Sequence, residues 1–278
     1  MSATAEAPTA TIDTSQTAKA PFFRLVSAEF RKMLNTRSGF WLLAITFGML
    51  ALVMGVILLV VALVDNASLT ASLVSEGMIL PLSLLVPVLA IMTVTTEWSQ
   101  RTHLVTFTLE PHRGRVVAAK LAVVALLGVA TIIAAVGFGS LTNVLYGVIT
   151  GNEVIWDLDV ETLAWTAGQQ ALWFLMAFGL AMLLLNTPGA VAIFYFFGLL
   201  APMMVYSPLY AIFETARNII PWIDLTYASM PFIGGNGGML MATEVGATEW
   251  AQLASAVGIW VVAPIVFGTW RVMRSEAK

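Results

Sequence analysis

The sequence EWSQRTHLVTFTLEPHRGRVVAAK, residues 97–120, lies between two long apolar runs. It contains both histidines and four of the Lys and Arg residues, in a chain that is 59% hydrophobic and only 10% charged. A water-soluble globule cannot bury an apolar fraction of that size, and the natural solvent for such a chain is a bilayer. We therefore expect an all-α integral membrane protein in which residues 97–120 form the working surface.

Six apolar runs flank this stretch and are expected to cross the membrane. The second run contains Pro81 and Pro87, which are tolerated because neighbouring helices satisfy the carbonyls that lose their partners. After the fifth run, residues 207–248 suggest a short helix at 209–220 that stops at Pro221, then a glycine-rich cluster at 234–238, and we expect this outer segment to be partly re-entrant. The predicted spans are residues 40–64, 79–96, 116–146, 163–185, 190–206 and 249–270, all within one transmembrane domain at 21–278.

The amino-terminal part is predicted to lie outside the spans. Residues 1–20 are rich in Ala, Thr and Ser and are expected to be a disordered cytoplasmic tail, without the features of a secretory signal peptide. In residues 21–36 apolar side chains recur at helical spacing beside a basic face, which predicts an amphipathic elbow helix in the headgroup layer, beginning at Pro21. The alternative is a soluble helix that binds a partner protein.

The distribution of charge predicts the orientation. With a cytoplasmic amino terminus and six alternating spans, twelve of the thirteen Lys and Arg residues fall on the inner side, and only Arg217 falls outside. Ten of the sixteen carboxylates fall on the outer side. This is the positive-inside pattern, and it places both termini and the 97–115 loop in the cytoplasm.

The inner loop carries a moderately specific motif. We expect a helix to continue from the second span past Arg101 and Thr102 until Pro111 ends it. Glu97, Thr102 five residues later, Pro111-x-Arg113 and Lys120, together with the elbow helix, six spans and the long outer segment, resemble the permease subunits of type-2 ABC exporters.

This resemblance implies a half-transporter in a bacterial plasma membrane. Two permease chains, identical or paralogous, would form the pathway, and two copies of a cytoplasmic ABC ATPase would bind ATP and Mg. The cargo would be hydrophobic or amphiphilic, such as a drug-like molecule, a lipid or a peptide. The loop would be the coupling element, and the docking residues implied by the resemblance are Glu97, Trp98, Arg101, Thr102, Phe107, Pro111 and Arg113.

A carboxylate at the boundary of an apolar span is costly unless it is paired or hydrated. Glu97 could pair with Arg101 one helical turn later, or with an elbow cation such as Arg31 or Lys32. The second alternative is our working hypothesis, because it would lock the elbow helix to the second span.

The spans themselves are poor in charge, which argues against proton or sodium coupling. Gly48 and Gly55 on the first span would allow close approach of another helix. Because spans one, two and five surround the dimer axis in the family, mild polar, aromatic and sulfur-containing side chains there are candidates to line a pathway. The candidates are Ser83, Thr93, Phe194, Tyr195, Phe197 and Met203.

Several chemistries are not supported by the sequence. The chain lacks a phosphate-binding P-loop, so we expect ATP hydrolysis in a partner, with no cofactor and no enzymatic activity in this chain. His103 and His112 do not have the spacing of a metal site. Two other functions remain open: a membrane anchor or assembly factor that recruits a soluble complex, and an ATP-independent carrier or channel.

Overall fold

A computed structural model of the chain describes residues 21–64, 69–100, 102, 112–158, 160–233 and 245–274. Six helical segments are long and apolar enough to cross a membrane, which confirms the predicted multi-pass helical architecture. They are α2 (Arg37–Leu63), α3 (Ala71–Ser99), α5 (Arg113–Thr150), α6 (Val160–Leu184), the fifth span Thr187–Ile212 and the sixth span Ala247–Arg274.

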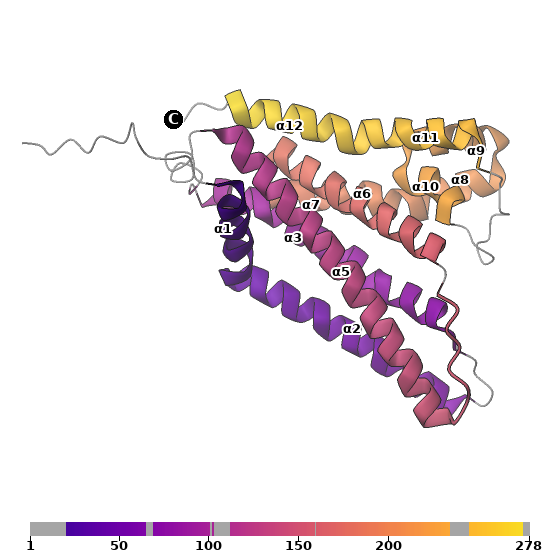
Figure 1. Cartoon of the computed structure of the whole chain (residues 1–278). Coiled ribbons are helices and arrows are strands. Elements are labelled where there is room, and N and C mark those ends of the chain that lie inside the picture. Colours follow the sequence, from indigo (N-terminus) through magenta and orange to yellow (C-terminus); the bar gives the residue numbers. More distant parts are fainter. Residues whose placement is uncertain are drawn as a thin grey trace, which may run out of the picture.

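Helix α1 (Phe22–Asn35) precedes the first span and is set at an angle to it (Figure 1). Its buried residues are Val26, Glu29 and Met33, which lie on one face. The turn into α2 is tight, because a Cβ atom on Gly39 would lie 2.0 Å from the carbonyl oxygen of Met33. A helix therefore forms where the elbow was predicted, and its position in the headgroup layer stays a prediction.

The core lies around α3 and α6. Half of the residues in the most apolar stretch of each of these helices are buried, against 17% in α2. Gly48 and Gly55 on α2 face open space, since a Cβ atom on either would meet nothing within 4 Å. No other part of the described chain packs against these glycines, and the close approach of another helix that they would allow stays a prediction.

The fifth and sixth spans each contain a π-helical segment. The fifth consists of α7 (Thr187–Tyr195), the π-helix η1 (Phe196–Tyr206) and α8 (Ser207–Ile212). The sixth consists of α11 (Ala247–Val257), the π-helix η2 (Gly258–Val262) and α12 (Ala263–Arg274). Pro202 lies inside η1, and Pro264 lies in the helix that follows η2. Because proline has no N–H, it leaves the carbonyl one turn earlier without its usual donor. A wider turn lets that carbonyl accept a hydrogen bond from another group.

Between these spans, α9 (Glu214–Ile223) and α10 (Leu225–Ile233) lie at the end of the bundle opposite α1 (Figure 1). The predicted helix at 209–220 is wrong in both bounds. The chain breaks at Phe213, whose backbone is extended, and Pro221 lies inside α9 instead of ending the helix. The break is stabilised by Arg217, which donates to the carbonyl oxygens of Tyr210 and Ala211 at the end of α8. The glycine-rich cluster at 234–238 lies outside the described residues.

Candidate functional site

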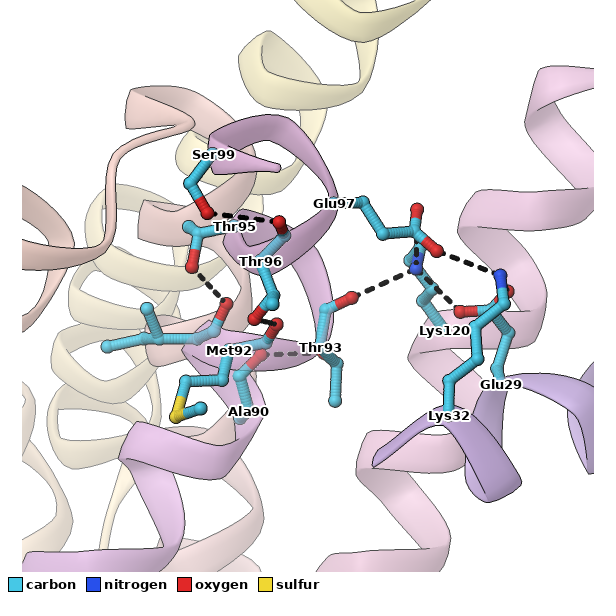
Figure 2. Close-up of polar contacts among 11 residues, drawn as sticks. Glu29, Lys32, Ala90, Met92, Thr93, Thr95, Thr96, Glu97, Ser99 and Lys120 are labelled. Carbon is cyan, nitrogen blue, oxygen red and sulfur yellow. Dashed lines mark hydrogen bonds and ion pairs between the residues drawn. The ribbon is translucent and has the colours of Figure 1, made fainter. Parts of the chain in front are cut away.

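Four charged side chains from three helices form a closed ring at one end of the bundle (Figure 2). Lys32 Nζ lies 2.6 Å from Glu29 Oε1 and 2.8 Å from Glu97 Oε1. Lys120 Nζ lies 2.6 Å from Glu29 Oε2 and 3.1 Å from Glu97 Oε2. Each ammonium therefore bridges both carboxylates, and we call these four residues the charge ring.

The local sequence explains how each member reaches the ring. Glu29 is three residues after Val26 and four before Met33, so it lies on the buried face of α1. Glu97 is in the last turn of α3, and Lys120 is two turns into the apolar helix α5. Lys120 also donates to the backbone carbonyl of Thr93, at 2.9 Å, which gives the buried ammonium a third acceptor. The ring thus joins α1 to the end of α3 and the start of α5.

The ring is electrically neutral and largely buried. The Lys120 and Glu29 side chains are only 7% and 9% exposed, whereas Lys32 is 45% exposed. Burial alone would lower the pKa of Lys32, but the adjoining carboxylates of Glu29 and Glu97 hold it above its ordinary value. Buried charges of this kind are stable only when fully paired, so each member depends on the other three.

A cavity of about 640 Å³ lies beside the ring. It is enclosed by α1, the first turn of α2, the second half of α3 and the start of α5, and its surface is mainly apolar. Leu89 and Met92 lie at the inner end of its α3 wall, and Gln100 and Thr102 lie at the outer end. The hydroxyl groups of Thr93 and Thr96 in this wall donate to carbonyl oxygens of their own helix (Figure 2).

The predicted pairing of Glu97 with an elbow cation is present, and the cation is Lys32. Arg31 is exposed on α1, away from the ring's buried face. The sequence interpretation missed Lys120 as a second partner of Glu97, and Glu29 as the carboxylate that shares both lysines with it. Two signals were available: Glu29 falls on the apolar face of α1, and Lys120 is a cation inside a predicted span, where a partner is expected.

Of the predicted docking residues, Trp98 and Thr102 lie in the described part of the chain, where the loop leaves α3. Trp98 is partly buried against the core, and Thr102 is exposed in a turn. The helix α3 ends at Ser99, and Gln100 and Thr102 lie in a turn, whereas residues 103–111 of the predicted continuation lie outside the described residues. The Ser99 hydroxyl donates to the Thr96 carbonyl at 3.0 Å, and such bonds compete with the helical ladder. Arg101, Phe107 and Pro111 lie outside the described residues.

Arg113 begins α5 and holds the end of the sixth span. Its guanidinium donates to the carbonyl oxygens of Val272, at 3.0 Å, and Met273. These are among the last carbonyls of α12, which have no partner within that helix. Arg271 in turn donates to the Leu183 carbonyl near the end of α6. Arg113 thus has a structural role beside the docking role, which stays a prediction.

The predicted pathway residues are in different environments. Phe194 is 1% exposed and contacts the ring of Trp173, and Phe197 packs on Trp260, with 4.7 Å between ring centroids. Tyr195 donates to the Leu84 carbonyl, whereas Met203 is 71% exposed. The Ser83 hydroxyl bonds the carbonyl of Leu80 within α3. Which of these residues face a pathway stays a prediction.

Charge is segregated between the two ends of the described bundle. Nine described Lys and Arg side chains and two carboxylates lie at the end that carries the charge ring. At the other end are six described carboxylates and Arg217. The basic side chains are Arg24, Arg31, Lys32, Arg37, Arg113, Arg115, Lys120, Arg271 and Arg274; the acidic ones at the other end are Glu153, Asp157, Glu161, Glu214, Asp224 and Glu249.

The comparisons with known proteins do not identify a family. No protein-family model matches the chain, and no curated protein matches it significantly. Within the described ranges, no group of three or more His, Asp or Glu residues is placed to hold a metal ion.

Proposed function

We propose that this chain is the membrane-spanning subunit of an ATP-driven exporter of the type-2 ABC kind. Two such chains form the pathway, and a separate cytoplasmic ATPase docks on each. The observation that carries the proposal is the charge ring, because it joins α1, α3 and α5 at the two ends of the segment that connects α3 to α5.

The ring gives that segment a mechanical role. The segment leaves α3 two residues after Glu97 and enters α5 seven residues before Lys120. Removal of one partner from a buried ion pair costs about 3–5 kcal/mol, and we expect a pairing of that strength to make α1 and the two span ends move together when the segment is pushed. A soluble ATPase that presses on residues 100–112 would therefore move three helices together.

The charge segregation supports an orientation with the ring in the cytoplasm. A cation-rich end faces the cytoplasm in most membrane proteins, and an ATPase would be found there. We therefore propose that both termini lie on the cytoplasmic side of a bacterial plasma membrane. The basic end also contains Arg113 and Arg115, beside the segment that would receive the ATPase.

Unpartnered apolar surface supports a pathway formed by two chains. Only 17% of the most apolar stretch of α2 and 22% of that of the fifth span is buried. Met203 and Met204 on the fifth span are 71% and 69% exposed, and flexible methionines suit surfaces that accept varied apolar partners. A second chain and a hydrophobic or amphiphilic cargo would cover part of this surface.

The test is purification of the tagged full chain from its native membrane in mild detergent, with mass identification of what stays bound. We expect a nucleotide-binding subunit that hydrolyses ATP in the complex. The double variant Arg101→Ala with Phe107→Ala should lose that subunit. Arg31→Ala, which removes an exposed cation from α1, is the control and should keep it.

Two outcomes would contradict the proposal. If the stably folded chain copurifies with no ATPase, the ABC assignment is wrong, and flux in liposomes containing this chain alone would establish a carrier or channel. If a soluble complex without ATPase activity copurifies through the same segment, the chain is a membrane anchor.

A further inference from the structure

The cavity beside the charge ring has a graded lining. Along α3, its wall runs from Leu89 and Met92 at the inner end to Gln100 and Thr102 at the outer end. Within α3, the eight residue steps from Leu89 to Glu97 span about 12 Å at the helical rise of 1.5 Å per residue, and Gln100 and Thr102 follow the end of the helix. Because α3 is apolar enough to cross a membrane, the apolar end of the wall points toward the bilayer interior and the polar end toward its surface.

The size of the cavity suits a small amphiphilic ligand. Its volume of about 640 Å³ is within the range of ordinary ligand pockets, which is roughly 300–1,000 Å³. On α1, Leu25, Ala28 and Met33 add apolar surface, and Val116 and Ala119 of α5 close the far side. Such a lining has room for an acyl chain.

The charge of the lining favours an anion. Glu29, Lys32 and Glu97 of the charge ring border the cavity. Lys120, which is not part of the lining, pairs with both carboxylates and makes the ring neutral. Arg24, which is exposed on α1 and lines the cavity, is the remaining lining charge among the described residues. A guanidinium binds phosphate in bidentate geometry, and the surrounding excess of Lys and Arg at this end raises the local concentration of anions.

We propose that this cavity binds one acidic phospholipid, with an acyl chain along Leu89, Met92 and Met33 and the phosphate at Arg24. The lipid would fill the space between α1 and the spans. It would thereby add to the contacts between the elbow helix and α3 beside the charge ring. This inference needs only the membrane architecture and is independent of the proposed transport function.

The experiment measures lipid binding to the full chain in neutral detergent by native mass spectrometry. The probes are dioleoylphosphatidylglycerol, which is anionic, and dioleoylglycerol, which has the same chains and no phosphate. We expect about tenfold tighter binding of the anionic lipid, the difference that one charge-assisted contact gives. Arg24→Gln should remove this preference, whereas Arg31→Gln, which removes a cation from the same helix outside the cavity, should keep it.

A second pair of variants tests the acyl-chain position. Ala28→Phe fills the cavity from an exposed helix position and should weaken binding of both lipids. Ala51→Phe adds the same ring at an exposed position on α2 outside the cavity and should not. Thermal melting of each variant shows that it is folded.

The proposal is overturned if the two lipids bind equally to the wild type, or if Arg24→Gln and Arg31→Gln behave alike. It is also overturned if Ala28→Phe leaves binding unchanged. Oleate and inorganic phosphate distinguish other sources of the anion: displacement of phosphatidylglycerol by equimolar oleate would assign the cavity to fatty acids, and displacement by phosphate would show a headgroup site without an acyl chain.

Discussion

Lys120 carries a charge into a helix whose neighbouring residues are apolar, and the fold compensates for it with Glu29, Glu97 and the Thr93 carbonyl. The arrangement makes the ring cooperative. Removal of any one member leaves a net charge in a place that excludes water, which is more costly than loss of one contact.

Replacing Lys120 by Met tests this cooperativity. We expect Lys120→Met to lower the unfolding free energy by about 3–5 kcal/mol, because two carboxylates are then left with a single ammonium. The readout is the melting temperature of the purified chain in detergent. The double variant Lys120→Met with Glu29→Leu restores neutrality and should lose less stability than Lys120→Met alone. If the double variant is the less stable of the two, the ring is not a charge-balanced unit.

Asp224 is a second residue whose environment opposes its charge. It is 3% exposed, and its carboxylate accepts a hydrogen bond from the Tyr227 N–H at 2.9 Å, at the start of α10. Burial raises the pKa of Asp224 to about 6, although backbone N–H groups of Tyr227 and Thr226 act in the opposite direction. Because the ordinary pKa of this carboxyl is 3.8, the fold loses stability as the pH rises from about 4 to about 6, and the loss is complete above pH 6.

We expect Asp224→Asn to stabilise the chain at pH 8 by up to about 3 kcal/mol, because Asn still caps a helix and carries no charge. The gain should shrink toward pH 5, where Asp224 becomes protonated. Melting temperatures at the two pH values provide the measurement. Asp157→Asn is the opposite control. The slight burial of Asp157 acts to raise its pKa, but hydrogen bonds from Ser72 hold that pKa below its ordinary value. The Asp157→Asn variant should therefore lose stability at pH 8. Equal pH profiles for both variants would refute the assignment.

At the scale of elements, close contacts between spans depend on particular glycines. A Cβ atom on Gly268 of α12 would lie 2.6 Å from the Cβ of Met182 and 2.7 Å from the backbone nitrogen of Leu183. The obstacle includes backbone, so a side chain at Gly268 would have to separate α12 from α6. Small residues allow this kind of approach between membrane helices.

Gly268→Ala should therefore destabilise the chain by about 1–3 kcal/mol, the usual range for overpacking. Gly48→Ala is the matched control in α2, where open space surrounds the glycine, and it should be neutral or stabilising by up to about 1 kcal/mol. Thermal melting in detergent compares them. Equal effects of the two substitutions would show that α6 and α12 do not approach as closely as described.

At the scale of the whole molecule, the segregation of charge predicts which end faces the cytoplasm. The chain has no cysteine, so a single introduced thiol can be followed without interference. We expect Asn152→Cys, at the acidic end, to react with a membrane-impermeant maleimide on intact cells. Ser38→Cys, at the basic end, should react only after permeabilisation. The reverse labelling pattern would show that the basic end faces outward, where a cytoplasmic ATPase could not reach the ring.

The sequence alone predicted the six spans and one pair of the charge ring, Lys32 with Glu97. Continuous apolar runs determine six spans because few other residues tolerate hydrocarbon, and the cost of an unpaired Glu97 indicated Lys32 as one of three candidate partners, with Arg31 and Arg101. Lys120 and Glu29 were missed because their proximity depends on the crossing of α1 over α5, which periodicity does not specify. At the break at Phe213, the Arg217 side chain donates to carbonyl oxygens six and seven residues earlier, a contact that apolar periodicity does not indicate. The expectation that Pro221 ends a helix gave the wrong bounds, because Pro221 lies inside α9.

The closed geometry of the charge ring has an evolutionary consequence. Since each ammonium touches both carboxylates, a change at one position is harmful unless another position changes with it. Replacement of the whole set by apolar residues can be neutral, however, because no charge is then left behind. Related sequences should therefore divide into two groups at positions 29, 32, 97 and 120, one with two acids and two bases and one without charge, and intermediates between them should be rare.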